Sequence, residues 1–304
     1  MNIAIDEVKS ALKKENIYFV CDEPMKKHTS FRIGGNADVL AEPANEDEVL
    51  CVVDVFKKYG MPFYVIGNGS NLLVSDDGYR GGIIKLGKRY SSVKINENKI
   101  EVKSGALLSA VSKVAAAESL SGFEELSGIP GSFGGAVYMN AGAYGGEIKD
   151  VVVSVKYLAE DLSIKTAEKS ELDFGYRKSM FVKNGGIVLS GIIELKEAKR
   201  DEILNKMAEL SAKRKEKQPL EYPSCGSAFK RPEGYFAAAL IEQAGLKGCR
   251  IGGAEVSEKH SGFVINVDSA TAKDVVELTD YIKNEVFKKF GVELEREMKM
   301  LGFN

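Results

Sequence analysis

The sequence contains few of the side chains that build metal centres and disulfide frameworks. It has only two histidines, His28 and His260, so a histidine-built metal site is not expected and we predict no bound metal. The four cysteines are scattered without a C-x-x-C pair, which argues against a disulfide framework or a zinc site and is typical of a reducing cytoplasm. They are Cys21, Cys51, Cys225 and Cys249.

Two further features are missing: an excess of one charge and a long apolar run. The 304 residues include 42 basic and 44 acidic ones, so no general field favours nucleic acid or an anionic membrane as a partner. The N-terminal segment has Ile5, Val8 and Leu12 at helical spacing and lacks the apolar core of a signal peptide. No run is long enough to span a membrane. We therefore expect a cytoplasmic protein, long enough for two domains.

The common nucleotide fingerprints are also absent, because no G-x-G-x-x-G follows a strand and no G-x-x-x-x-G-K-[ST] occurs. Glycine is nevertheless concentrated in two segments. Residues 128–146 contain seven glycines in nineteen positions, and Gly67-Asn68-Gly69-Ser70-Asn71 follows the apolar run 62–66. The apolar residues of 128–146 are too interrupted for an amphipathic helix, so we predict a loop there. Such loops expose main-chain N–H groups that bind phosphate.

Two readings of these glycine segments are open. Both segments could be tight turns in a strand-rich protein. Together they favour a ligand with an extended polyanionic part, such as a dinucleotide, on a scaffold other than the Rossmann fold.

The first two-thirds of the chain mixes helices and strands without strict βαβ alternation. We expect a helix over 46–59, with Asn45 as its N-cap and Gly60 as its end, and a second helix over 107–119. Strands are expected in the β-branched, apolar stretches, with a hairpin turn at Asp161-Leu162. The strand ranges are 62–66, 83–86, 93–95, 100–103, 151–158 and 187–195.

A second domain is expected to begin with a charged helix over 198–217. A turn at 222–226, a helix over 235–244 and a strand over 263–267 follow. A long helix over 270–290 would be capped by Ser269 or Thr271 and ended by Gly291. The last segment, 292–301, alternates strictly and is predicted to be a strand, with Glu297 on its solvated face.

Two segments carry candidate chemistry. Residues 224–232 combine Ser227, Cys225, Lys230 and Arg231, and such a turn can present a hydroxyl or a thiol beside an anion site. The alternative is a surface loop with incidental polar residues. Cys225 would need a depressed pKa to react. In 175–179, an arginine beside a tyrosine suits recognition of a carboxylate or phosphate, or is simply a stacked surface arginine.

Taken together, several short motifs resemble the UDP-N-acetylenolpyruvoylglucosamine reductase family over nearly the whole length. The chain is similar to the compact subclass that lacks a substrate-capping tyrosine loop. The motifs are His28-Thr29-Ser30-Phe31-Arg32-Ile33-Gly34-Gly35, residues 66–73, residues 128–146, Tyr176-Arg177-Lys178-Ser179, residues 225–230, Gly252-Gly253-Ala254 and residues 297–302.

The resemblance implies an α+β fold, namely an FAD-binding fold of the p-cresol methylhydroxylase type with two α+β subdomains and a C-terminal α+β substrate domain. The FAD-binding domain would comprise residues 1–198, split near 88–92, with a last strand at 296–304 returning to it. The substrate-binding domain would comprise 199–295. The implied FAD contacts are Ile66, Gly67, Asn68, Gly69, Ser70, Asn71, Leu72, Gly128, Ile129, Pro130, Gly131, Ser132, Gly134, Gly135, Ala136, Asn140, Gly142 and Ala143.

The resemblance also implies a flavoenzyme with noncovalent FAD and NADPH as hydride donor, acting as a monomer on a nucleotide-sugar. It would reduce an enolpyruvyl ether, with Arg177, Ser227 and Glu297 as catalytic residues. The implied substrate contacts are Tyr144, Tyr176, Gly226, Lys230 and His260. Arg231 stands where many relatives carry asparagine, and His260 stands where some carry glutamine. Diphosphate recognition by Lys247 is a further hypothesis. The alternatives are another flavin oxidoreductase on the same fold, often with covalent FAD, and a non-catalytic nucleotide-sugar binding protein.

Overall fold

The computed structural model describes residues 5–303, which fall into two compact units. Unit 1 comprises the described residues of Met1–Cys21, Val39–Asn68 and Gly81–Lys213. Unit 2 comprises those of Asp22–Asp38, Gly69–Arg80 and Arg214–Asn304. Each unit therefore combines segments that are far apart in the sequence, and each is described by itself below.

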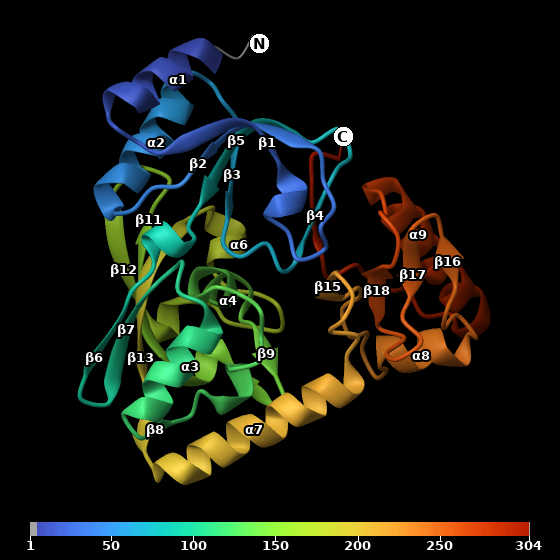
Figure 1. Cartoon of the computed structure of the whole chain (residues 1–304). Helices are drawn as coiled ribbons and strands as arrows, with labels where there is room; N and C mark the ends of the chain where they lie inside the picture. The colour runs from blue at the N-terminus through green and yellow to red at the C-terminus, as the bar shows by residue number, and fades with distance from the viewer. Residues whose placement is uncertain (1–4, 304) are drawn as a thin grey trace. The chain divides into compact units, whose positions relative to one another are not determined.

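The elements alternate irregularly between helices and strands, as Figure 1 shows along the chain. The helices are α1 (Ile5–Lys14), α2 (Glu46–Lys58), α3 (Leu108–Ala117), α4 (Phe133–Met139), α5 (Ile148–Val151), α6 (Phe181–Asn184), α7 (Arg200–Lys217), α8 (Ala237–Gln243) and α9 (Ala272–Phe290). Short 3-10 turns lie at η1 (Met25–Lys27), η2 (Lys88–Tyr90), η3 (Glu124–Leu126) and η4 (Lys169–Glu171). Among residues 5–303, no helix is both long and apolar enough to cross a bilayer.

Nineteen strands are described between residues 5 and 303. They are β1 (Phe19–Pro24), β2 (Asn36–Ala41), β3 (Phe63–Ile66), β4 (Leu72–Val74), β5 (Tyr79–Lys85), β6 (Val93–Asn96), β7 (Lys99–Lys103), β8 (Leu120–Ser121), β9 (Gly142–Ala143), β10 (Gly146–Glu147), β11 (Val152–Leu158), β12 (Ile164–Glu168), β13 (Ile187–Glu194), β14 (Lys196–Glu197), β15 (Ser224–Ser227), β16 (Arg250–Ile251), β17 (Ala254–Val256), β18 (Phe263–Asn266) and β19 (Lys299–Leu301).

Helices α1 and α2 pack against a four-stranded sheet of order β1-β2-β5-β3, in which β3 and β5 run parallel. The predicted helix over 46–59 is confirmed, since α2 has Asn45 as its N-cap, and the Asn45 side chain accepts from the Glu48 N–H at 2.9 Å. Val8 and Leu12 of α1 are fully buried, as the helical spacing predicts.

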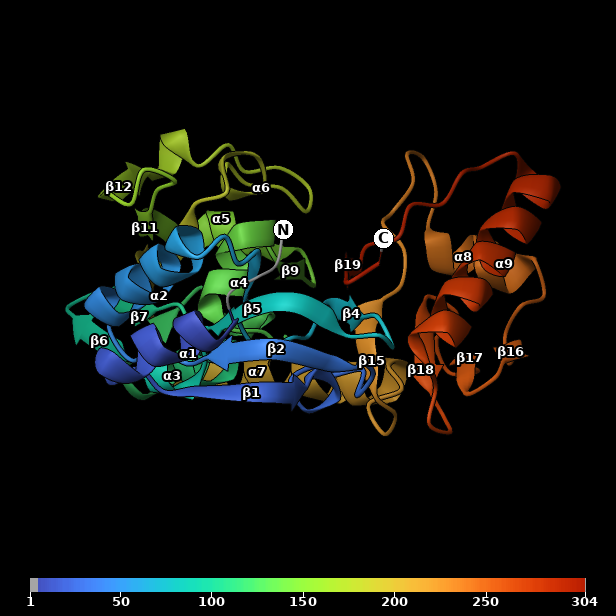
Figure 2. The same cartoon turned by 90° about the horizontal axis from the view of Figure 1, so that it is seen from above.

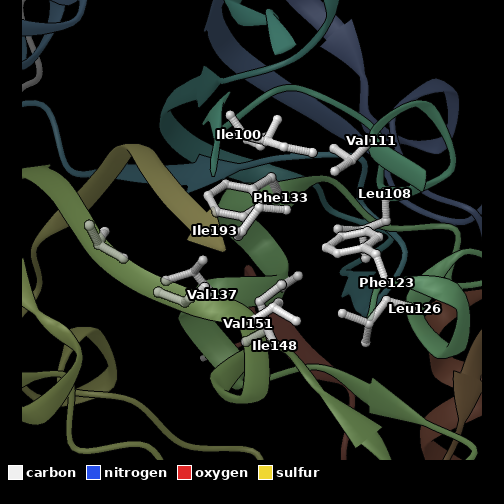
Figure 3. Close-up of a cluster of buried hydrophobic side chains, with 14 of the residues drawn as sticks. Ile100, Leu108, Val111, Phe123, Leu126, Phe133, Val137, Ile148, Val151 and Ile193 are labelled. Atoms are coloured by element: carbon white, nitrogen blue, oxygen red, sulfur yellow. The ribbon is translucent and has the colours of Figure 1, made fainter. Parts of the chain in front are cut away.

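A five-stranded antiparallel sheet of order β12-β11-β13-β7-β6 carries the largest core of unit 1. Figure 3 shows Phe133 and Val137 of α4 in this core, among the side chains of Ile100 and Ile193. All four are completely buried. The hairpin predicted at Asp161-Leu162 joins β11 and β12 and is confirmed.

Unit 2 contains the antiparallel sheet β15-β18-β17-β16 together with α8 and α9 (Figure 2). The predicted long helix is confirmed as α9, with a capping box at Thr271 rather than Ser269 and a left-handed Gly291 at its end. The apolar core of unit 2 also takes in Phe31 and Ile33 from the N-terminal third of the sequence.

Two expectations for unit 2 need correction. Only residues 299–301 of the predicted strand 292–301 form a strand, β19, which pairs in parallel with β4. Leu294 and Met298 are buried as the alternation predicts, but Met300 is 36% exposed. Residues 294–298 are therefore extended chain with alternating side chains but no partner strand. The one exception is an isolated bridge between Arg296 and Phe229. The turn predicted over 222–226 is also wrong in its second half, because strand β15 begins at Ser224.

Candidate active site

The two glycine segments meet in unit 1. The Asn68 side-chain amide donates a hydrogen bond of 2.6 Å to the Pro130 carbonyl. A Cβ at Gly67 would overlap the Ser132 hydroxyl in its present position, so the missing side chain at Gly67 leaves the space that this hydroxyl occupies. Residues 67–68 and 130–132 consequently form one surface of main chain and small side chains.

Residues 69–72 belong to unit 2, where they are fixed by the segment that follows η1. The Ser30 N–H donates to the Gly69 carbonyl at 3.1 Å. A Cβ at Gly69, whose φ is +62°, would overlap the His28 carbonyl oxygen. Leu72 opens strand β4.

The loop predicted over 128–146 is only partly a loop, which corrects the expectation that no helix forms there. Residues 133–139 form α4, Asn140 adopts a left-handed conformation with φ +46°, and β9 and β10 make a hairpin. The helix exists because Phe133 and Val137 are buried, so tertiary packing overrides the low propensity of its glycines. Tyr144, 42% exposed, lies in the hairpin turn with φ +53°.

One polar atom near this surface lacks a partner. The Ser132 hydroxyl is buried and makes no hydrogen bond within the described part of the chain. The N–H groups of Phe133 and Gly134 donate to the carbonyls of Ala106 and Ser104 at 2.8 and 2.9 Å, so they serve the fold. A buried hydroxyl without a partner is rare in proteins and is compatible with a polar ligand at this position.

Arg177 lies in a tight turn of unit 1. Gly175 and Lys178 exchange main-chain hydrogen bonds of 3.0 and 3.2 Å on either side of it. Arg177 has φ +52°, a left-handed conformation that side-chain-bearing residues rarely adopt. Its guanidinium carbon lies 5.1 Å from the centre of the Tyr176 ring, and Tyr176 is 51% exposed. The stacked arginine considered from the sequence is thus present, on a strained turn.

Ser227 is turned outward by a β-bulge in unit 2. Ser224 pairs with Ile265 and Ser227 with Phe263, so strand β15 has one more residue than its partner between these positions. Gly226 has φ +83° within this bulge. Plain alternation would put Ser227 on the same face as the buried Cys225, whereas the bulge leaves Ser227 exposed.

The segment that follows Ser227 pairs with the segment that contains Glu297. The Glu297 N–H donates to the Ala228 carbonyl at 2.9 Å, and the Lys230 N–H donates to the Glu295 carbonyl at 2.8 Å. The Asn71 side chain donates to the Glu297 carbonyl at 3.3 Å. Two of the three predicted catalytic residues, Ser227 and Glu297, therefore lie beside each other, although they are 70 positions apart in the sequence.

Sequence reasoning missed Arg296, which fixes the direction of Glu297. Its guanidinium donates to the Thr279 hydroxyl at 2.7 Å and to the Val276 carbonyl at 3.1 Å, and it lies 2.7 Å from the Asp280 carboxylate, all on α9. Because neighbouring side chains of extended chain point to opposite faces, Glu297 points away from α9. The signal was present in the sequence, since Arg296 is the one charged residue on the apolar face of the alternation in 292–300.

Cys225 is unsuited to act as a nucleophile. Burial, with a smaller contribution from the nearby Glu297 carboxylate, raises the pKa of its thiol to about 12. The thiolate that a reactive cysteine needs is therefore not populated near neutral pH. This excludes the alternative that the 224–232 segment presents Cys225 to a ligand.

The remaining candidates of unit 2 have partners within the protein. The Lys230 ammonium pairs with Glu295 and the Lys247 ammonium with Glu242. The Arg231 guanidinium stacks at 3.8 Å on the Phe236 ring. His260 accepts from the Gly262 N–H at its Nδ1 and packs edge-on against Phe263 at 4.9 Å. Burial lowers the pKa of His260 below its ordinary value.

Comparison with known proteins identifies both parts of the chain. Residues 218–301 match the family described as UDP-N-acetylenolpyruvoylglucosamine reductase, C-terminal domain, and residues 37–167 match the FAD binding domain. The UDP-N-acetylenolpyruvoylglucosamine reductase of Clostridioides difficile is 50% identical over 96% of this chain and 95% of its own length. That of Caldanaerobacter subterraneus is 50% identical over 99% of this chain and 98% of its own.

Solved structures agree with these matches. The UDP-N-acetylenolpyruvylglucosamine reductase of Thermus caldophilus has a TM-score of 0.80 and is 38% identical, over 94% of this chain and 98% of that one. A glucooligosaccharide oxidase from Acremonium strictum, 12% identical with a TM-score of 0.51 over 96% of this chain and 60% of its own, shares the fold alone. The predicted fold class, an FAD-binding domain with a C-terminal domain of mixed helices and strands, is confirmed.

Replacing Gly226 tests the bulge. A Cβ there would meet no atom within 4 Å, so the cost of substitution is backbone strain rather than a clash. We expect Gly226→Val to lower the free energy of unfolding by about 1–3 kcal/mol, and Gly226→Asn to lower it less, since asparagine tolerates positive φ. Urea unfolding of the two variants measures this. Equal losses in both would contradict a strained conformation at Gly226.

The pH dependence of the protein's stability should reflect the titration of the partly buried His260. Its pKa is lower in the folded state than in the unfolded one, so below pH 6.5 the unfolded state binds more protons. Stability should therefore fall as the pH drops through this window, by up to about 1.4 kcal/mol per pH unit. In His260→Asn, whose Oδ1 can still accept from the Gly262 N–H, the fall should be shallower. Urea unfolding between pH 5 and 8 compares the two, and parallel curves would refute the assignment.

Proposed function

The chain belongs to the UDP-N-acetylenolpyruvoylglucosamine reductase family, and on that premise we propose that it reduces UDP-N-acetylglucosamine enolpyruvate to UDP-N-acetylmuramate with NADPH as donor. As a member of this family it is an FAD-dependent oxidoreductase of peptidoglycan precursor synthesis. The observation that supports the chemistry best is the main-chain pairing of residues 228–230 with 295–297, which brings together the segments that carry Ser227 and Glu297.

The residues of the glycine segments fit an FAD diphosphate. The partnerless Ser132 hydroxyl and the bare main chain at Gly67 offer a donor and close access to an anion. We propose that 66–72, 128–132, 134–136, 140 and 142–143 hold the cofactor. Asn140 would contact FAD through its main chain, because its side-chain amide already forms hydrogen bonds within the protein. Bound FAD supplies the hydride that is added to C3 of the enolpyruvyl group.

Arg177 is proposed to stabilise the charge that develops on the substrate. Addition of hydride to C3 leaves negative charge at C2, and this charge spreads into the adjacent carboxylate. A guanidinium presents two parallel N–H donors to a carboxylate and stays charged at all relevant pH values. Donors fixed before the reaction, where charge develops during it, are usually the largest catalytic contribution.

Ser227 is proposed as the acid that protonates C2. A serine hydroxyl is a weak acid in water, but a carbanion-like carbon is basic enough to take its proton, with Lys230 or water stabilising the alkoxide that remains. The bulge at Gly226 leaves Ser227 exposed, so its hydroxyl can reach a ligand. The thiol of Cys225 is buried and cannot. General acid catalysis of this kind contributes roughly 10²–10⁴ in rate.

Glu297 is proposed to donate a hydrogen bond to the substrate carboxylate in its protonated form. A carboxyl group beside an anionic, partly desolvated substrate is expected to have a raised pKa. Its fixed direction, set by Arg296 on the opposite face, supports this role because the group would not have to reorient during the reaction.

The proposal keeps the division of the sequence into an FAD-binding part, 1–198 with 296–304, and a substrate part, 199–295. The pairing of β19 with β4 supports the return of the C-terminal segment to the N-terminal part of the sequence. Tyr144, Tyr176, Gly226, Lys230 and His260 remain the proposed substrate contacts. A cytoplasmic location is in keeping with four free cysteines, and we propose a monomer.

The activity can be tested directly on the purified protein. A visible flavin spectrum whose chromophore is released on denaturation would support noncovalent FAD. NADPH should be consumed rapidly only when UDP-N-acetylglucosamine enolpyruvate is present, with UDP-N-acetylmuramate as product. A colourless protein that takes up no FAD would contradict the proposal and favour a nucleotide-sugar binding protein.

Ser132→Ala separates cofactor binding from stability. The hydroxyl has no partner in the protein, so its loss should change the free energy of unfolding of the apoprotein by less than about 0.5 kcal/mol. FAD affinity should fall about tenfold or more, the value of a hydrogen bond to a charged group. Flavin fluorescence titration and urea unfolding measure the two effects.

Ser112→Ala is the matched control for this experiment. Ser112 is also buried, and its hydroxyl donates to the Ser109 carbonyl within α3. This variant should lose about 0.5–1.5 kcal/mol of stability and bind FAD normally. Unchanged FAD affinity in Ser132→Ala would remove Ser132 from the proposed cradle.

Ser227→Ala should separate the two halves of the reaction. Reduction of the flavin by NADPH needs no proton from Ser227 and should keep its rate. Reoxidation by the enolpyruvyl substrate should slow by about 10²–10⁴, which corresponds to roughly 3–5 kcal/mol of barrier. Stopped-flow absorbance follows each half-reaction, and equal rates for the variant and the parent in both would refute the assigned role.

A further inference from the structure

Helix α4 lies between two parts of the proposed site in unit 1. Its first turn follows Ser132, whose hydroxyl has no partner, and its last residue is followed by Asn140. From its C-terminal end, two hydrogen bonds reach the turn that carries Arg177. A helix with fixed ends can therefore hold both parts in a constant relation within this unit.

The two hydrogen bonds attach the Arg177 turn to α4, one before Arg177 in the sequence and one after it. Before the turn, the Asn140 side-chain amide donates to the Gly175 carbonyl at 3.0 Å. After it, the Ser179 hydroxyl donates to the Tyr138 carbonyl at 2.6 Å. Asn140 and Ser179 are both completely buried, so water does not compete for either bond.

The turn needs such support because its own conformation is unfavourable. Arg177 is held with φ +52°, and Tyr176 beside it is half exposed. Residues in sparsely populated backbone conformations persist only where surrounding contacts determine them. The Gly175–Lys178 pairing closes the turn, and the bonds from Asn140 and Ser179 attach it to α4.

Asn140 is itself fixed in place. Its left-handed conformation ends α4, its side-chain oxygen accepts from the Lys149 N–H at 3.1 Å, and its amide also donates to the Glu147 carboxylate at 3.2 Å. The helix cannot shift easily, since Phe133 and Val137 anchor it in the core (Figure 3). The support is thus rigid from the core to the turn.

We propose that Asn140 and Ser179 are positioning residues that act through Arg177, holding its guanidinium ready for the substrate carboxylate. The proposal rests on the proposed function, because it takes Arg177 as the group that meets this carboxylate. It also assigns the Asn140 side chain to the protein rather than to the cofactor. Asn140 and Ser179 would then matter for the step that uses Arg177 and not for the step that precedes it.

The test compares Asn140→Asp and Ser179→Ala with the parent holoenzyme. Aspartate keeps the oxygen that accepts from Lys149 and tolerates the left-handed conformation, but it cannot donate to Gly175. In stopped-flow experiments on Ser179→Ala, flavin reduction by NADPH should stay within about twofold, and in both variants reoxidation by the enolpyruvyl substrate should slow about tenfold or more. In an Arg177→Lys background, the same changes should have little further effect. Ser112→Ala, which removes a buried hydroxyl away from the turn, should alter neither half-reaction.

Additive losses with Arg177→Lys, or equal slowing of both half-reactions, would overturn the positioning role. If Asn140→Asp does not fold, Ser179→Ala carries the same test.

An assay without turnover separates this proposal from the proposed function. Limited trypsin cleavage after Arg177 should be several-fold faster in both variants than in the parent and Ser112→Ala. An unchanged cleavage rate would show that these two hydrogen bonds do not hold the Arg177 turn in place. This result would count against the proposal even if the parent proved inactive on the enolpyruvyl substrate.

Discussion

The burial of Phe133 against β13 is the interaction on which the site in unit 1 depends. Gly191 in this strand leaves the space for the Phe133 ring, since a Cβ there would come within 2.9 Å of it. This packing makes a helix out of a segment whose glycines disfavour one. Once α4 is fixed, the Ser132 hydroxyl at its start and the Asn140 amide at its end are fixed as well. A larger residue at Gly191 would therefore disturb the segment around Ser132 and the Arg177 turn together.

In unit 2, strand register rather than a buried helix fixes the positions of the candidate side chains. Its candidate groups lie on short extended segments, where a one-residue change of register reverses every side chain. The bulge at Gly226 makes such a change once and turns Ser227 outward. The pairing of 228–230 with 295–297 then sets the register of Glu297 relative to Ser227. Irregular strand geometry, which would be a defect elsewhere, is what presents the hydroxyl here.

The sequence predicted best the features that depend on neighbouring residues. Asn45 and Thr271 cap their helices, because capping needs only a side chain three residues from the N–H that it accepts from. Helix α4 was missed because its stability comes from contacts with strands β7 and β13, which are distant from it in the sequence. The alternation of 292–301 predicted which side chains are buried at 294 and 298, but not that the segment lacks a partner strand over most of its length.

The candidate site residues also divide into those that a local sequence pattern indicates and those that depend on distant contacts. No local pattern indicated Glu297, which looked like one of several carboxylates on a solvated face, and the family resemblance alone singled it out. The structure shows, through Arg296, what sets the direction of the Glu297 side chain. A charged residue between the buried Leu294 and Met298 costs free energy unless it is paired, and its bonds to Thr279, Val276 and Asp280 provide that pairing. Since Arg296 is committed to α9, its two neighbours must face the other way, and Glu295 is occupied with Lys230. Glu297 therefore faces away from α9, on a segment whose main chain pairs with the residue after Ser227.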